Sequence, residues 1–253
     1  MHVRTRGQGG TPLLALHMSP LSGGMWDAVA PRLARDRLVI MPDRIGFGDS
    51  DRLAEPIAFP GYALATIDVL DALDVGTVDV LGIHTGACEA IELASAHPQR
   101  VRRIAVVSLP AMTDEERRTF KATYSGMPQP AADGSHLQRY WQWWSEADAD
   151  TRWPPELVHA RVLDHLRAGP DVWWTYHAVF DYPAGERAAA VRQPFTVFGP
   201  HDDLWETTRR AAADLPPHAA FVELPHLGYE IFTLAADEMG ERVCAFFDAG
   251  EPG

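Results

Sequence analysis

The sequence predicts an α/β fold with a mostly parallel sheet flanked by helices. Short apolar runs of strand length alternate along most of the chain with segments whose apolar residues recur every three or four positions, the period of a helix. One long, helical and tryptophan-rich segment interrupts this alternation ahead of the last two strand candidates. A chain of 253 residues is long enough to bury a large core as one such unit.

The expected strands and helices follow one another along the chain. The strands are the apolar runs at residues 13–18, 37–42, 77–83, 102–109, 194–199 and 220–224. The helices are the segments of helical period at residues 25–36, 61–75, 87–98, 204–215 and 231–247. Because helical crossovers join parallel strands, the carboxyl ends of these strands meet at one edge of the sheet, where open α/β sheets bind ligands.

Residues 111–189 break the alternation and predict a helical insertion. This polar segment contains the tryptophan-rich runs YWQWWSEADADTRW and DVWWTYHAVF. We expect it to form a cap over the carboxyl edge of the sheet, with residues 1–110 and 190–253 as the core domain. A cap in this place forms the roof of the ligand pocket, so its aromatic surface indicates a small, largely apolar organic substrate.

Four cap residues are expected to contact the substrate, namely His136, Trp143, Trp144 and Trp174. Other indoles of the cap must pack as ordinary core, because adjacent side chains on a helix cannot all face one way. His136, in the run DGSHL at the start of the cap, either points at the ligand or lies on the surface.

The overall composition excludes several classes of protein. The formal net charge is −13 and arginine supplies nearly all of the positive charge, so the sequence offers no basic patch for nucleic acid. No apolar run approaches the roughly 20 residues that span a bilayer, and the N-terminal run MHVRTRGQGG has no apolar signal core. We therefore expect a cytoplasmic protein with no nucleic acid and no membrane as partner. The oligomeric state stays open, with a homodimer as one alternative.

The sequence gives no sign of a cofactor or a metal. Cys88 and Cys244 form neither a metal-ligand pattern nor a disulfide framework, and a buried structural thiol is the expected role of Cys88. The nucleotide fingerprint G-x-G-x-x-G is absent after the first strand. A metal site would have to be assembled from the distant residues His17, His84, Asp202 and His226. No local ligand spacing such as H-x-x-x-H supports one, so we expect no cofactor and no metal.

Four landmarks of the sequence carry a family resemblance. The run GIHTG at residues 82–86 stands at a strand-to-helix corner, where the pattern G-x-S-x-G places a nucleophile, but its central residue is His84. LHMSPLSGGMW follows the first strand, PDRIGFGDSDR follows the second, and FGPHDDLW ends the strand at residues 194–199. In this order the landmarks resemble the α/β-hydrolase fold family over essentially the whole chain.

The resemblance implies roles for individual residues. His17 and Met18 lie in the family's oxyanion loop, where His17 is structural and Met18, in place of a glycine, contacts the substrate. Asp202 matches the catalytic acid. The catalytic histidine of the family follows the last strand as P-x-x-G-H, and the run PHLGY puts Tyr229 at that position, with His226 three residues earlier in the substrate pocket. By position the triad is therefore His84, Asp202 and Tyr229.

The residue at the elbow determines which chemistry is available. A covalent acyl-serine route is unavailable at this position, because His84 replaces the hydroxyl or thiol that would carry the acyl group. Direct nucleophilic attack by His84 stays open as a less favoured alternative, since an acyl-imidazole offers little gain without a second base. Gly82 and Gly86 retain the tight corner, which projects His84 into the pocket. The positive end of the following helix opposes protonation of the imidazole, so we expect His84 to be neutral and to act as a base.

Neighbouring groups complete the predicted site. The hydroxyl of Tyr229 is expected to link the carboxylate of Asp202 to the ring of His84. The backbone N–H groups of Ser19 and Thr85 are expected to polarise a substrate carbonyl.

These residues predict an enzyme that acts on a small, largely apolar carbonyl, ester or lactone compound by non-covalent acid–base chemistry centred on His84. Hydrolysis by activated water and a proton-transfer reaction such as elimination, cyclisation or decarboxylation both stay open. Two alternatives also stay open. His226 acts as a displaced base, or the protein is a catalytically inactive, ligand-binding or receptor-like homologue.

Overall fold

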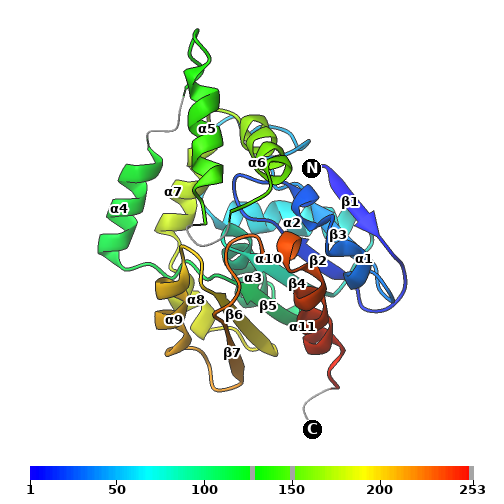
Figure 1. The fold of residues 1–253 in the computed structure, drawn as a ribbon. Helices are drawn as coiled ribbons and strands as arrows, with labels where there is room; N and C mark the ends of the chain where they lie inside the picture. The colour runs from blue at the N-terminus through cyan, green and yellow to red at the C-terminus, as the bar shows by residue number, and fades with distance from the viewer. Residues whose placement is uncertain (126–128, 149–151, 251–253) are drawn as a thin grey trace.

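The computed structural model describes residues 1–125, 129–148 and 152–250. Within them a seven-stranded sheet runs in the order β1-β3-β2-β4-β5-β6-β7 (Figure 1). All neighbouring strands pair in parallel except β1, which is antiparallel to β3. The strands are β1 Val3–Arg6, β2 Leu13–Leu16, β3 Val39–Pro42, β4 Val78–Ile83, β5 Val101–Val107, β6 Phe195–Pro200 and β7 Ala219–Leu224.

The apolar runs correctly predict β2 to β7, but they do not predict β1. The sequence of β1, VRTR, has a single apolar residue, so its hydropathy gives no strand signal. Pairing with β3 forms this strand instead, with Val3 opposite Pro42. An edge strand needs burial on one side only, which explains why a polar sequence is compatible with it.

Helices cover the sheet and connect its strands. The α-helices are α1 Ala30–Leu33, α2 Pro60–Ala72, α3 Thr85–Ala96, α4 Asp114–Tyr124, α5 Ser135–Ser145, α6 Pro155–Ala168, α7 Trp173–Asp181, α8 Ala184–Ala189, α9 Trp205–Ala212, α10 Ile231–Leu234 and α11 Ala236–Asp248. Two 3₁₀ turns are η1 Gly23–Trp26 and η2 Pro98–Arg100. Helix α1 packs against α11, and α2 and α8 both pack against α3.

Two of the predicted helices are each divided in two. Residues 25–36 form only the end of η1 and the short α1, because Pro31 lacks the N–H that would continue a helix through it and instead stands in the first turn of α1. Residues 231–247 form α10 and α11, separated at Ala235, whose φ of −122° and ψ of 35° are not helical.

The centre of the sheet holds the candidate site in place. Strands β2, β3, β4 and β6 are buried along their whole length, as expected for strands covered on both faces. Three residues follow the carboxyl ends of neighbouring strands, namely His84 after β4, Ser108 after β5 and Asp202 after β6. Their positions are therefore fixed by a rigid core.

The helices between β5 and β6 gather over one end of the sheet, where α4, α5, α6 and α7 stand clear of it (Figure 1). Helix α8 packs against α3 instead. We therefore interpret α4–α7 as the cap, which is narrower than the expected range 111–189. A buried ion pair, Arg161 Nε to Glu230 Oε1 at 2.6 Å and Arg161 Nη2 to Glu230 Oε2 at 2.7 Å, ties α6 to the loop after β7.

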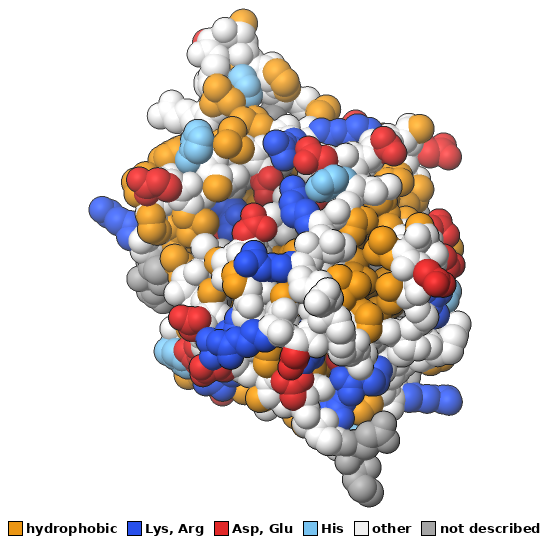
Figure 2. Space-filling model, turned by 90° about the vertical axis from the view of Figure 1, so that its right-hand side faces the viewer, with side chains coloured by type: hydrophobic (Ala, Val, Ile, Leu, Met, Phe, Trp, Pro, Cys, Tyr) orange, Lys and Arg blue, Asp and Glu red, His pale blue; other side chains and the backbone are white. Residues whose placement is uncertain are grey.

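The surface and the helices agree with the charge and hydropathy of the sequence. On the face shown in Figure 2, basic side chains are interspersed with acidic ones and do not form a continuous basic patch. Among the described residues, every helix is too short or too polar to cross a bilayer.

Candidate active site

The elbow geometry predicted from GIHTG is present between β4 and α3. His84 has a φ of 50° and a ψ of −114°, a strained conformation that projects its side chain from the corner. Both flanking glycines are required by close backbone contacts. A Cβ atom on Gly82 would lie 2.1 Å from the carbonyl oxygen of Gly86, and one on Gly86 would lie 2.0 Å from that of Leu16.

The imidazole of His84 contacts the predicted acid directly. His84 Nε2 lies 2.9 Å from Asp202 Oδ2, and the Asp202 side chain is fully buried. The hydroxyl of Ser108 donates to the same oxygen, and the backbone N–H of Leu204 donates to Oδ1 at 3.0 Å. With these donors the orientation of the carboxylate is fixed, so the two side chains form a preorganised His–Asp dyad.

Tyr229 does not lie between the two members of this dyad, so the expected chain from Asp202 through Tyr229 to His84 is wrong. The Tyr229 ring instead packs edge to face against His84, with centroids 5.0 Å apart. Trp144 and Trp153 of the cap lie against its other sides, at 6.2 and 5.9 Å. The reason is the length of the side chain at the elbow. An imidazole reaches Asp202 directly, whereas a serine is too short and needs a third residue between itself and the acid.

Nearby carboxylates control the charge of the ring. Burial lowers the pKa of His84, but the Asp202 carboxylate in hydrogen-bond contact raises it, as do Asp203 and Glu230, and the net result is a pKa above the usual value. The expectation that the surroundings oppose protonation of His84 is therefore wrong in direction. It rested on the helix N-terminus alone, whereas the carboxylates contribute the larger effect.

Asp203 is a second carboxylate at the dyad. Its Oδ1 lies 3.9 Å from His84 Nε2, and its side chain lines the cavity with 42% of its surface exposed. Burial raises the pKa of Asp203 to about 6; the nearby His84 ring lowers this pKa and the Asp202 carboxylate raises it. This site therefore holds a second group with a raised pKa, Asp203, beside His84.

The expected oxyanion donors lie beside the dyad. Ser19 and Thr85 both line the same cavity as His84. The backbone N–H of Ser19 donates to the hydroxyl of Thr85 at a long 3.4 Å, and Thr85, as the first residue of α3, has a backbone N–H without an intrahelical acceptor. Both residues thus line the cavity that the dyad faces.

Arg44 holds the oxyanion loop in place through hydrogen bonds. This buried side chain donates to the backbone carbonyl of His17 at 2.7 Å and to the hydroxyl of Ser19 at 3.3 Å, and its Nε contacts Glu89 at 2.7 Å. The ring of His17 accepts from the backbone N–H of Arg44 at 2.8 Å and donates to the carbonyl of Met18 at 2.8 Å. Burial and the Arg44 charge lower the pKa of His17 to about 3, so this ring is neutral and structural.

The dyad faces a narrow aromatic cavity. Its volume is about 40 Å³, that of one or two water molecules. The lining residues are Ser19, Pro20, His84, Thr85, Pro110, Met112, Phe120, Tyr124, Trp143, Trp144, Tyr176, Val179, Phe180, Asp203, Leu204 and Tyr229. The core supplies the polar groups, and α4, α5 and α7 of the cap supply most of the aromatic ones.

The sequence and the fold then agree on the family. Residues 11–178 match the alpha/beta hydrolase fold family. The chain belongs to this family. It is 37% identical to 2-hydroxymuconate semialdehyde hydrolase of Pseudomonas sp. (strain CF600) over 102 residues. This match covers 39% of the chain and 36% of that protein. It is also 37% identical to haloalkane dehalogenase of Sphingobium indicum over 112 residues. That match covers 42% of the chain and 38% of that protein. The chain thus spans little more than a third of the length of these relatives.

Solved structures extend the likeness beyond residue 178. A hydrolase from Pseudomonas aeruginosa PA01 superposes with a TM-score of 0.80 at 20% identity, over 98% of this chain and 94% of that one. The enol-lactonase from Burkholderia xenovorans LB400 superposes with a TM-score of 0.82 at 17% identity, over 98% and 96%. At these identities the likeness shows the α/β-hydrolase fold alone, including the segments that carry Asp202 and Tyr229.

Trp143 and Trp144 line the cavity of this α/β-hydrolase-fold protein, but four other residues expected to contact the substrate do not. Met18 is fully buried in the core and does not line the cavity. The ring of His136 accepts from the backbone N–H of Ala131 and braces the start of α5. Trp174 lies on another face of α7, along a second cavity. His226 is 55% exposed and contacts Glu238 on the surface, so it is not a displaced base in this arrangement.

The sequence reasoning missed Asp203 and Ser108, although signals for both are present. Asp203 directly follows the predicted acid in the run HDDLW. Ser108 ends the strand that neighbours β6, and the carboxyl ends of adjacent parallel strands lie side by side. A polar residue at the end of one such strand is therefore a candidate partner for an acid at the end of the next.

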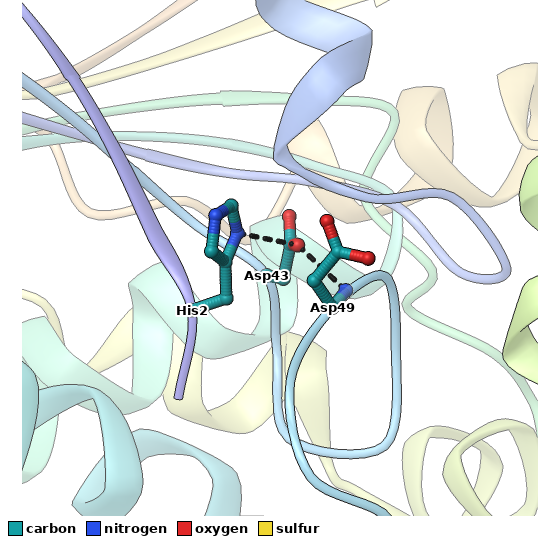
Figure 3. A group of neighbouring side chains, drawn as sticks. All are labelled: His2, Asp43 and Asp49. Carbon is teal, nitrogen blue, oxygen red and sulfur yellow. Dashed lines mark hydrogen bonds and ion pairs between the residues drawn. The ribbon is translucent and has the colours of Figure 1, made fainter.

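Within the described ranges, two groups of side chains have the spacing of metal ligands. In the first, Figure 3 shows His2 Nδ1 and the backbone N–H of Asp49 both contacting the Asp43 carboxylate. The guanidinium of Arg4 also pairs with Asp43, so a cation already occupies this position. The second group is His84, Asp202 and Asp203. There the hydrogen bond between His84 and Asp202 occupies the ring nitrogen, so we interpret the group as an acid–base dyad.

Proposed function

We propose that this α/β-hydrolase-fold protein is an enzyme that performs non-covalent acid–base chemistry with His84 on a small, largely apolar carbonyl, ester or lactone compound. The observation that carries the proposal is the 2.9 Å contact between an imidazole at the elbow tip and a buried carboxylate, at the wall of an aromatic cavity. A histidine oriented by a carboxylate is the usual arrangement of a general base.

The dyad can accept and return one proton. In the neutral ring, Nε2–H donates to Asp202 and the lone pair of Nδ1 is available as a base. When Nδ1 takes a proton from water or from a substrate carbon or hydroxyl, the imidazolium formed is stabilised by the Asp202 carboxylate. The N–H groups of Ser19 and Thr85 stabilise negative charge that develops on the substrate oxygen. Return of the proton to the product regenerates the neutral ring.

The lining of the cavity and the curated relatives support the substrate class. Aromatic rings of the cap surround the dyad, and such a lining suits an apolar compound with few polar groups. The relatives named above are a 2-hydroxymuconate semialdehyde hydrolase and a haloalkane dehalogenase, whose names describe small organic substrates.

The test of this proposal is turnover by the wild-type protein across a panel of small esters, lactones and aldehydes or ketones, 2-hydroxymuconate semialdehyde included, in water enriched in ¹⁸O. We expect product from at least one class. Label in the product acid identifies hydrolysis, whereas an unlabelled product identifies elimination, cyclisation or decarboxylation.

The second candidate function is ligand binding without turnover. It is favoured by the departure of the chain from the family pattern at two triad positions, since His84 and Tyr229 replace the usual nucleophile and base. This candidate predicts saturable binding of panel compounds with no product from any of them. Binding without product would therefore replace the enzyme proposal with this one.

Replacing Tyr229 by phenylalanine separates its packing role from a catalytic one. The variant keeps the ring that packs against His84 and removes only the hydroxyl. Because His84 contacts Asp202 directly, we expect kcat/KM to stay within a few-fold of wild type. The measurement is kcat/KM for the substrate that the panel identifies. A loss of two orders of magnitude or more would instead place the hydroxyl in the proton path.

A further inference from the structure

Helix α7 separates two cavities. Tyr176, Val179 and Phe180 face the cavity of the dyad. The opposite side of the helix lines a second and larger cavity, with Trp173, Trp174, His177, Ala178 and Asp181. At 100° per residue, the two sets fall on separate arcs of the helix, so no α7 side chain is shared between the cavities.

The second cavity has the size and lining of a small-molecule site. Its volume is about 710 Å³, within the usual range for ligand pockets. Besides α7, its walls come from the loop and start of α2 at residues 56–60 and from Tyr182, Pro183 and Arg187. Phe59, Trp173 and Trp174 supply aromatic surface, and prolines and alanines supply most of the rest.

One buried carboxylate gives this cavity a specific polar group. Glu92 of α3 lines it with a side chain that is only 6% exposed. The hydroxyl of Tyr182 at 2.8 Å, and Nε and Nη2 of Arg187 at 3.2 and 2.7 Å, all donate to the same oxygen, Oε2. Among the described residues no donor contacts the other oxygen, Oε1. A ligand in the cavity that donates to Oε1 would therefore add a charge-assisted hydrogen bond that the protein itself does not supply.

We propose that the cavity behind α7 is a second binding site, separate from the dyad, for a small aromatic molecule that donates an O–H or N–H group to Glu92. Flat aromatic compounds pack between the indoles of Trp173 and Trp174 and the ring of Phe59. Compounds such as phenols and arylamines combine that surface with the donor that Oε1 lacks. Arg187 holds the carboxylate in a fixed orientation.

The experiment uses 2-naphthol as the probe and measures its dissociation constant by titration calorimetry. We expect wild-type protein to bind 2-naphthol about tenfold or more tightly than 2-methoxynaphthalene, which has the same rings but no donor. Ala178→Trp fills the cavity and should weaken 2-naphthol binding at least about tenfold. Leu64→Trp adds the same bulk at an exposed position on α2 away from the cavity and should leave binding unchanged.

Two further variants locate the site. Glu92→Gln should reduce the preference for 2-naphthol over its methyl ether, because the acceptor loses its charge. His84→Ala should bind 2-naphthol as wild type does, because the dyad lies across α7. Circular dichroism and thermal unfolding check each fold, and Ala58→Trp, at an exposed position on the same cavity, replaces Ala178→Trp if that variant does not fold. No binding to wild type, equal binding to the filled variant, or an unchanged preference in Glu92→Gln would overturn the proposal.

Discussion

Replacing His84 by alanine is expected to lower kcat/KM by about 10²- to 10⁴-fold, the usual contribution of a general base. The substitution removes the imidazole whose Nε2 contacts Asp202 and which lines the cavity, while the glycine-lined corner and the buried strands that support it stay in place. The measurement is steady-state kinetics on the substrate that the panel identifies, with thermal unfolding to confirm the fold.

His226→Ala is the matched control for this substitution. It also removes an imidazole that contacts a carboxylate, but His226 lies on the surface against Glu238. We expect its kcat/KM to equal that of wild type. If the His84 variant kept its activity and the His226 variant lost it, His226 would be the base, and the assignment of His84 as the base would be wrong.

Replacing Asp202 by asparagine is expected to reduce the rate and also to move its pH dependence. The base is active when neutral, so the activity of wild type should fall as the pH drops through the raised pKa of His84. The Asp202 charge is the largest contribution that raises this pKa, whereas burial lowers it. Without that charge the pKa of His84 falls, and the acid limb of the profile should shift to lower pH. We expect kcat/KM at its optimum to fall by about 10²- to 10⁴-fold, because the imidazolium loses its stabilising partner.

Asp203→Asn gives the control for this profile. Asp203 also raises the pKa of His84, but from 3.9 Å and without the hydrogen bond. Its removal should shift the acid limb in the same direction by a smaller amount, with a smaller loss of rate. The measurement is kcat/KM against pH for wild type and both variants. An acid limb in Asp202→Asn that stayed in place, or moved to higher pH, would contradict the assignment of His84 as the base.

The sequence predicted where β2 to β7 lie along the chain and put His84 and Asp202 after strand ends, because both depend on patterns along the chain. Apolar runs identify β2 to β7, and the corner at GIHTG and the run HDDLW identify His84 and Asp202 at the ends of strands. β1 was not predicted because it is a polar edge strand. Its hydrogen bonds to β3 form it, and its own hydropathy gives no signal.

The relations between side chains were harder to predict, because they depend on reach and on direction. Spacing along the chain does not reveal that an imidazole at the elbow reaches Asp202, and so Tyr229 was assigned a bridging role that the structure does not support. Adjacent tryptophans on α7 face different ways around the helix, and hydropathy does not say which side meets the dyad. The charge of His84 likewise depends on carboxylates distant in sequence.

The narrowness of the cavity beside His84 has a consequence for the speed of any reaction there. A space that admits one or two water molecules receives an organic compound of ten or so heavy atoms only after the side chains or helices that line it move. Under the proposed function, each cycle then includes one such opening for entry and another for release, and their frequency sets a ceiling on turnover.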